Sequence, residues 1–157
     1  MAEYTFREKY NAFIGGLELQ NIRLMSINAK LREPEFPGSM KVDVKTKTDF
    51  SFQDENRLVT DVNAIFSFRD VSSRRIHAKI DITLRVEYRY EVPPDQDMLD
   101  IFRDTSLMVN VWPYLRFWGQ IITQGFGWPS FLLPLFKSLS WVEKGVSSEK
   151  EGDEPVK

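Results

Sequence analysis

Three consecutive segments of this chain alternate between apolar and polar residues, and this pattern is the strongest constraint on its fold. The segments are residues 41–52, 58–68 and 76–92. Side chains that alternate with a period of two lie on opposite faces of a β-sheet, one dry and one wet. Short connections between such segments favour antiparallel neighbours. A strand of 17 residues at 76–92 would be more than about 50 Å long, so we expect it to bend or to end early.

A further strand is predicted at residues 17–31, and its alternation is interrupted. The apolar residues change parity after Leu19 and again at Met25. Because one extra residue reverses the alternation, the pattern indicates a β-bulge near residues 20–25, unless both faces of the strand are partly covered. Before this strand, residues 5–14 form either a short amphipathic helix or a frayed terminus with local apolar contacts.

Two helices are predicted after the sheet, which ends at Pro93-Pro94. Asp95 or Asp97 can cap a short helix that runs to about residue 103, and Thr105 or Ser106 can cap a longer one that runs to about residue 123. The longer segment has helical spacing of apolar residues, and we expect it to cover the dry face of the sheet. Its apolar residues are Leu107, Met108, Val111, Leu115, Trp118 and Ile122, with Tyr114 and Ile121 beside them.

The end of the chain divides into three parts. Pro113 should kink the long helix or mark its restart, and Gly125 is a plausible stop. A last short helix is predicted from Leu135 to Val142. From Glu143 the sequence is charged and nearly devoid of large apolar groups, so we expect residues 143–157 to be disordered.

Composition excludes several classes of protein. The 157 residues fit one domain, and the absence of cysteine removes disulfides and thiolate chemistry. We expect no signal peptide and no membrane insertion, because the N-terminus lacks a cationic start and no apolar run reaches about 18 residues. The expectation is therefore a soluble, cytoplasmic protein.

No enzyme motif, metal site or cofactor site is recognisable, so we expect a protein that is not an enzyme. Phosphate loops, nucleophile elbows and zinc helices are absent, and the single histidine, His77, is predicted to be a solvated surface residue. Lys41, Lys45 and Lys47 form a row on one strand face, but Asp43 and Asp49 interrupt it. Because the net charge is −2, we expect no binding to nucleic acid.

The sequence from Val111 to Phe136 is unusually aromatic. Eight of its 26 residues are Phe, Trp or Tyr, and its second half is punctuated by Gly and Pro while still carrying large apolar side chains. Loops are normally polar because they lie on the surface. An apolar loop therefore either joins the core, is buried between subunits, or forms a groove for extended apolar polypeptide.

The residues of this segment resemble those of the SecB protein-export chaperone family. Members of that family carry an aromatic-Pro-Tyr-X-Arg motif in the main helix, matched here by Trp112, Pro113, Tyr114 and Arg116. A glycine then leads into an apolar crossover loop, which is matched here from Gly125 onward. The strand at residues 17–31 is also similar to the family's opening strand, and the resemblance extends from about Leu17 to Phe136.

The resemblance implies an α+β fold: a four-stranded antiparallel sheet with one face covered by a long helix, an apolar crossover loop and a short C-terminal helix. The implied division is an N-terminal extension at 1–16, a SecB-like domain at 17–142 and a charged tail at 143–157. The loop is shorter than in the export chaperones, and the final helix is truncated.

The implied function is that of an ATP-independent chaperone (a holdase) that works as a homotetramer, a dimer of dimers. It would bind unfolded client polypeptides or preproteins in apolar grooves, either for export with SecA as a partner or for a dedicated client such as the antitoxin of a toxin–antitoxin pair. The implied client-binding residues are Phe126, Trp128, Phe131, Leu132, Leu133 and Phe136. The alternative is a structural assembly subunit whose apolar loop is permanently buried in an oligomer, and a less favoured one is RNA binding through the lysine face.

Overall fold

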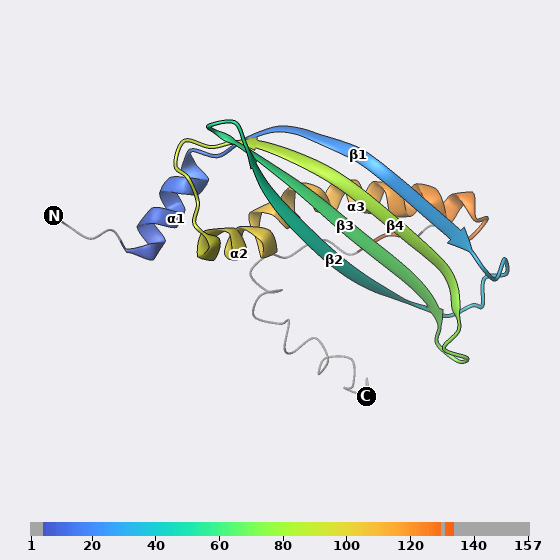
Figure 1. Cartoon of the computed structure of the whole chain (residues 1–157). Helices are drawn as coiled ribbons and strands as arrows, with labels where there is room; N and C mark the ends of the chain where they lie inside the picture. The colour runs from blue at the N-terminus through green and yellow to red at the C-terminus, as the bar shows by residue number, and fades with distance from the viewer. Residues whose placement is uncertain (1–4, 130, 134–157) are drawn as a thin grey trace.

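Four long strands and three helices make up the part of the chain that the structure describes. The computed structural model describes residues 5–129 and 131–133 (Figure 1). The elements are α1 (Phe6–Gly15), β1 (Glu18–Leu31), β2 (Met40–Gln53), β3 (Arg57–Asp70), β4 (Ile76–Arg89), α2 (Gln96–Asp104) and α3 (Ser106–Gly125). The expected short helix at 135–142 and the charged tail lie outside the described residues.

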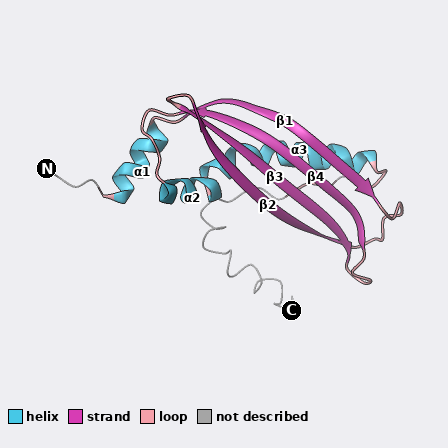
Figure 2. Cartoon of the chain, in the orientation of Figure 1, coloured by secondary structure: helices cyan, strands magenta, loops and turns pink. Residues whose placement is uncertain are grey.

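The four strands form one antiparallel sheet in the order β1-β4-β3-β2. Figure 2 shows this sheet as one curved layer, with α2 and α3 on one of its sides. The predicted α+β architecture is confirmed. As expected, β4 ends before its pattern of alternation does, at Arg89 instead of residue 92. Because β1 and β2 are at opposite edges, the chain between them, residues 32–39, must pass the ends of β4 and β3. We call this segment the β1–β2 connection.

The slip in the alternation of β1 comes from two irregularities. The register of β1 with β4 shifts at Gln20 and again at Met25. Each extra residue reverses the alternation, so Ile22 and Ile27, which the sequence pattern places on opposite faces, both pair with buried residues of β4. The predicted bulge is confirmed, and the second shift, which moves the register by one more residue, restores the original parity of the alternation in the last part of the strand.

The core lies between the sheet and the two C-terminal helices. The apolar residues of β3 and β4 that face α3 are almost fully buried, in agreement with the alternation that predicted them. Tyr88 joins the two layers, because the side-chain amide of Asn110 on α3 donates to its hydroxyl at 2.8 Å. Burial raises the pKa of Tyr88 to about 12, although the hydrogen bond from Asn110 acts in the opposite direction.

The N-terminal residues form a helix, so the reading as a frayed terminus is wrong. Thr5 caps α1 through a capping box with Glu8, which satisfies backbone N–H groups that the first turn leaves without partners. Phe13 is fully buried, and its ring meets that of Phe102 on α2 edge-on at 5.7 Å. The cap stabilises α1 as a helix, and the aromatic contact fixes it to the core.

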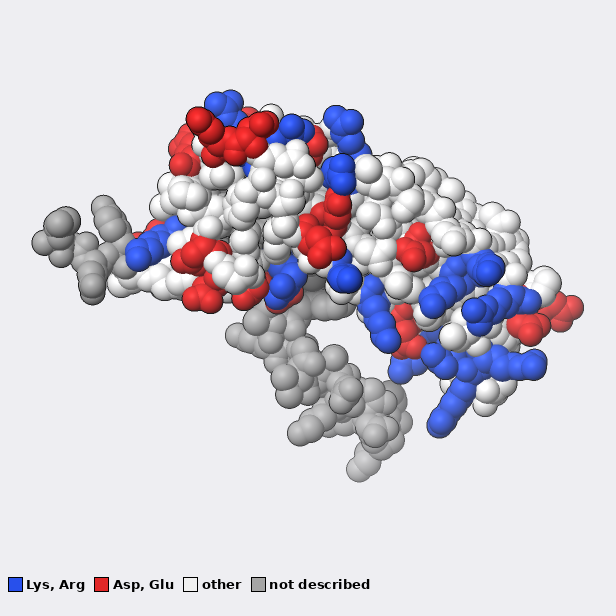
Figure 3. All heavy atoms as spheres, in the orientation of Figure 1, with Lys and Arg blue, Asp and Glu red and all other residues white. Residues whose placement is uncertain are grey.

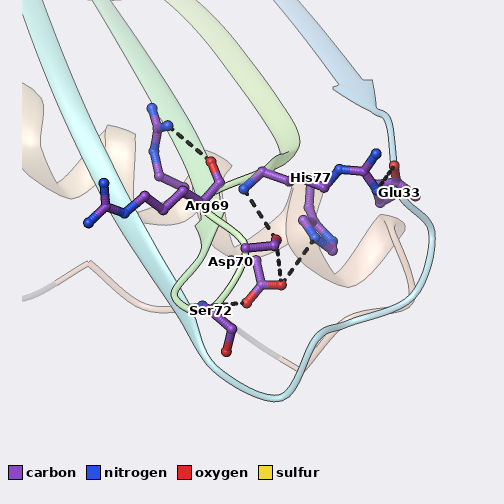
Figure 4. Close-up of polar contacts among 8 residues, drawn as sticks. Glu33, Arg69, Asp70, Ser72 and His77 are labelled. Carbon is purple, nitrogen blue, oxygen red and sulfur yellow. Dashed lines mark hydrogen bonds and ion pairs between the residues drawn. The ribbon is translucent and has the colours of Figure 1, made fainter.

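The prediction for His77 is wrong, because the side chain is buried instead of solvated. A register shift between β3 and β4 leaves this residue without a direct partner in β3, so the alternation does not apply to it. Its Nε2 lies 3.9 Å from Oδ2 of Asp70 (Figure 4). That oxygen also accepts from the hydroxyl of Ser73, while Oδ1 of Asp70 accepts from the backbone N–H of Ser72. Its carbonyl oxygen accepts from the backbone N–H groups of Arg32 and Glu33, which anchors the start of the β1–β2 connection.

Candidate functional site

Helix α3 is apolar on two sides. The predicted side, which includes Leu107, Val111 and Leu115, is buried against the sheet as expected. The opposite side carries apolar residues that remain exposed: Val109, Tyr114, Phe117 and Ile121. A shallow hollow of about 320 Å³ lies on this side, lined by Pro113, Tyr114, Phe117 and Trp118. The second apolar side shows that the helix has more apolar surface than the sheet needs.

The start of α3 differs from expectation, and of the two expectations for Pro113, a kink or a restart, the restart does not occur. Thr105 is the N-cap residue but makes no side-chain cap; its hydroxyl instead donates to the carbonyl of Ile101 at 2.6 Å. The helix also continues across Pro113, so it has no restart there. The missing N–H of Pro113 leaves the carbonyl of Val109 without a helical donor, and both residues are exposed, so this loss occurs on the side away from the sheet.

The chain turns sharply at the end of α3 and folds back over the helix. Gly127 has a φ of 78°, a conformation that glycine adopts without steric cost. The turn is held by Thr123, which is fully buried. Its carbonyl accepts from the N–H of Trp128 at 3.2 Å, and its hydroxyl oxygen accepts from the N–H of Phe131 at 3.4 Å. The loop of residues 126–133 is therefore pinned to the last turn of the helix.

Trp128 connects this loop to the far end of the sheet. Its indole Nε1 donates to the carbonyl of Pro34 in the β1–β2 connection at 3.0 Å. Its ring meets those of Phe36, Phe68 and Phe126 at centroid distances of 5.9, 5.7 and 5.2 Å. Only 7% of Trp128 is exposed, and this residue contacts both the connection and β3, while Phe131 adds a second contact of the loop with Phe68 at 5.2 Å.

A small apolar cavity lies beside Trp128. It has a volume of about 140 Å³ and is lined by Phe36, Met40, Val42, Phe68, Trp128, Pro129 and Phe131. An apolar cavity of about 150 Å³ holds a benzene-sized molecule, so this one is large enough for one aromatic or branched aliphatic side chain. We call it the loop cavity. Its walls come from β2, β3, the β1–β2 connection and the loop after α3.

The structure divides the predicted client-binding residues into two groups. Trp128 and Leu133 are buried and belong to the core, so the loop folds back onto the body of the protein at these positions. Phe126 and Phe131 are half-buried, while Leu132 is 56% exposed. Phe136 lies outside the described residues. Of the predicted residues that the structure describes, those with side chains available for contact with another polypeptide are Phe126, Phe131 and Leu132.

The helix motif is divided in the same way. Trp112 is buried, whereas Pro113 and Tyr114 lie on the exposed apolar side of α3. The guanidinium Nε of Arg116 donates to the carbonyl of Leu133 at 2.8 Å, so Arg116 holds the end of the loop against the helix. No role of this kind was expected for Arg116 from the sequence.

Residues of the β1–β2 connection and β2 also belong to the site, and the sequence reasoning missed them. Phe36 stands between two prolines in the turn after the first strand, where no site residue was predicted, and Val42 belongs to the segment 41–52, which was interpreted only as a strand. Met40 lies just before that segment and was given no role. A large aromatic residue in a polar turn was the one available indication, because such a side chain needs cover.

Other kinds of site are not evident in the described part of the chain. No group of three or more His, Asp or Glu residues within it is arranged to hold a metal ion. Of its helices, none is both long and apolar enough to cross a membrane. A wider hollow, of about 620 Å³, lies at the opposite end of the sheet beside the β2–β3 turn, and it is lined by polar and charged residues.

Comparison with known proteins identifies the fold. No family model matches the sequence, and no curated protein matches it. Among solved structures, a SecB-like chaperone of Mycobacterium tuberculosis, in complex with a ChAD peptide from the HigA1 antitoxin, aligns with a TM-score of 0.73 at 14% identity, covering 82% of this chain and 96% of that chain. A protein of unknown function from Streptococcus agalactiae aligns with a TM-score of 0.42 at 14% identity, covering 76% of this chain and 97% of that chain. This chain therefore has the SecB-like fold, which confirms the predicted resemblance at the level of the fold.

Proposed function

We propose that this chain is an ATP-independent chaperone, a holdase, that binds unfolded polypeptides through the apolar surface around the loop cavity. The observation that carries the proposal is the loop cavity itself, because it is apolar, large enough for one side chain and bordered by exposed apolar residues. The SecB-like neighbour was solved with a peptide bound, which supports a polypeptide as the ligand.

The physical properties of the surface suit an unfolded client. Phe36 in the β1–β2 connection and Leu132 in the loop after α3 are both substantially exposed. Apolar contacts are non-directional, so one such surface can accept many sequences. A single side chain in the cavity would bind weakly, and several subunits acting on one chain would strengthen the binding.

Within this proposal the predicted residues have different roles. Phe126, Phe131 and Leu132 contact the client, and Phe136 is proposed to extend the same surface. Trp128 and Leu133 hold the loop in place from inside the core. The division follows from exposure, since a buried side chain cannot meet a client unless the loop opens.

The exposed apolar side of α3 is proposed to be an interface between copies of the chain in a homotetramer. Four of its apolar residues, Val109, Tyr114, Phe117 and Ile121, are more than 40% exposed, and contiguous exposed apolar patches are often interaction sites. The alternative function, a structural assembly subunit, is favoured by this same side of the helix but leaves the loop cavity without a use. Among dedicated clients, an antitoxin segment is supported by the peptide in the neighbouring structure; protein export with SecA in the cytoplasm is the other possibility.

Suppression of aggregation tests the proposal. A chemically unfolded model protein is diluted into buffer with and without the chain, and light scattering is followed over time. We expect an equimolar amount of subunit to reduce scattering without ATP, and Phe131→Ser with Leu132→Ser to weaken this effect at least fivefold.

The control is Phe6→Ser, which removes an exposed aromatic residue of α1 far along the chain from the loop. It should leave the suppression unchanged. Equal suppression by the wild type and the Phe131→Ser/Leu132→Ser variant, with both folded, would show that the loop is not the client-binding surface. No suppression by the wild type would refute the holdase function.

A further inference from the structure

The charges of this protein are segregated along the sheet. Figure 3 views the sheet from the face that α3 does not cover, and Lys and Arg side chains gather at the end where β1 finishes and β3 turns into β4. Acidic side chains are more frequent toward the end with α1 and α2. We define the basic patch by the six cationic residues Lys30, Lys41, Lys45, Arg69, Arg74 and Lys79.

The sheet register places like charges directly opposite each other within the basic patch. Lys30 of β1 pairs with Lys79 of β4, and Lys41 of β2 pairs with Arg69 of β3. Like charges at directly opposite positions destabilise a sheet. Among the described residues no carboxylate lies within 4.0 Å of Lys30 or Lys79, and Arg69 has only a 3.6 Å contact with Asp43.

Other cationic pairs on the same face are compensated. Arg85, opposite Arg23, receives a bidentate contact from Asp61, with N–O distances of 2.8 and 3.0 Å. Arg57, opposite Arg89, has Glu87 at 2.7 Å. The pair Lys30 and Lys79 therefore differs from these two pairs, because no carboxylate contacts either lysine among the described residues. An external anion would reduce the repulsion between the two lysines.

The basic patch is adjacent to the loop cavity across the edge of the sheet. Met40 and Val42 line the cavity, while Lys41, between them, faces the open side. Because β2 is an edge strand, a polypeptide that leaves the cavity meets Lys41 first on the open face, and it reaches Lys79 and Lys30 by continuing across β3 to β4 and β1.

We propose that the basic patch binds acidic residues that flank the apolar anchor of a client, so that the chain selects apolar segments next to Asp or Glu. This inference rests on the proposed holdase function. A polypeptide fits better than a nucleic acid, because the strand positions on the open face in the described residues carry no aromatic side chain for base stacking. The net charge of −2 also opposes a long polyanion.

The test uses three synthetic peptides of equal length with the same central Trp-Leu-Phe anchor, flanked by Glu, by Ser or by Lys. Affinities are measured by fluorescence anisotropy in low salt and in 0.5 M salt. Two to three exposed ion pairs correspond to about a tenfold difference, so we expect the Glu-flanked peptide to bind about tenfold more tightly than the Ser-flanked one in low salt. Screening should remove most of this preference in high salt.

The variant Lys30→Gln/Lys79→Gln should reduce the preference to about twofold and leave the affinity for the Ser-flanked peptide unchanged. The control Arg23→Gln/Arg89→Gln removes the same charge from the same face outside the patch and should keep the preference. Loss of folding is not expected in the first variant, because it removes a repulsive pair; a circular dichroism spectrum checks this.

Four outcomes would overturn the inference. Equal affinity for the Glu-flanked and Ser-flanked peptides refutes the acidic preference while leaving the holdase function intact. An unchanged preference in the Lys30→Gln/Lys79→Gln variant refutes the assigned patch. Displacement of the Glu-flanked peptide by a single-stranded RNA at lower concentration than by unlabelled peptide assigns the patch to nucleic acid instead. Absence of binding to every peptide refutes the holdase function together with this inference.

Discussion

Replacement of Trp128 by alanine should release the loop after α3 while the sheet stays folded. A buried Trp side chain removes on the order of 150–250 Å² from water, which corresponds to about 4–6 kcal/mol as an upper estimate. Measured Trp-to-Ala changes cost about 3–5 kcal/mol. The lost hydrogen bond to Pro34 adds little, because Pro34 is exposed and water can replace the indole N–H.

Most of this loss should appear as local opening. The loop contacts the β1–β2 connection and β3 through Trp128, whereas the rest of the core is formed by β3, β4, α2 and α3. Segments with few contacts open at lower free energy than the whole domain. In hydrogen exchange, the amides of Trp128 and Phe131 should lose protection in Trp128→Ala, and those of β3 and β4 should keep it.

Leu132→Ala is the matched control. Leu132 is in the same loop but exposed, so its truncation should change the free energy of unfolding by no more than about 0.5 kcal/mol. Retained protection of the loop amides in Trp128→Ala, or a loss in Leu132→Ala as large as that in Trp128→Ala, would refute the assignment of Trp128 as the residue that holds the loop.

Four further changes have defined outcomes. Arg116→Gln removes the donor to the carbonyl of Leu133 and should cost about 1.5–3 kcal/mol in urea unfolding; a cost below 0.5 kcal/mol would contradict the tether. The hydrogen bond from Arg85 lowers the pKa of Asp61, so its stabilisation is present above the ordinary Asp pKa and is lost as pH falls below about 4; Asp61→Asn should flatten this limb of the stability profile. Burial raises the pKa of Tyr88 to about 12, above the value of about 10 for an unfolded chain, so stability should fall as pH rises from 10 to 12, and Tyr88→Phe should remove that dependence. Tyr114→Ser with Phe117→Ser should shift the native mass to smaller assemblies if α3 forms the subunit interface, and an unchanged mass would rule that interface out.

The strands and helices could be predicted from the sequence because their patterns are long. Alternation over 14 residues in β3 and β4 has few competing readings. The same pattern failed for His77, since the register shift that buries it depends on the turn between two strands and not on the order of residue types. The double shift in β1 was predicted only in part. The sequence showed the change in parity, but it did not show that two separate bulges produce this change and then reverse it.

The candidate site was predictable only in outline. Aromatic density identified the loop after α3, but exposure decides the role of each residue, and exposure depends on contacts distant in sequence. Trp128 is buried by Pro34 and Phe36, more than 90 positions earlier. Arg116 and Thr123 hold the loop through backbone atoms, and a side-chain pattern carries no information about such partners.

Native mass spectrometry with and without an unfolded client tests the central proposal most directly. The chain is mixed with a reduced, unfolded protein of known mass, with Phe131→Ser/Leu132→Ser in parallel. We expect a homo-oligomer of the wild type that gains the mass of one client without ATP, and a marked loss of that complex in the variant. If the wild-type oligomer keeps its own mass even at client concentrations at which the client aggregates, the proposal that this surface binds unfolded polypeptide is contradicted.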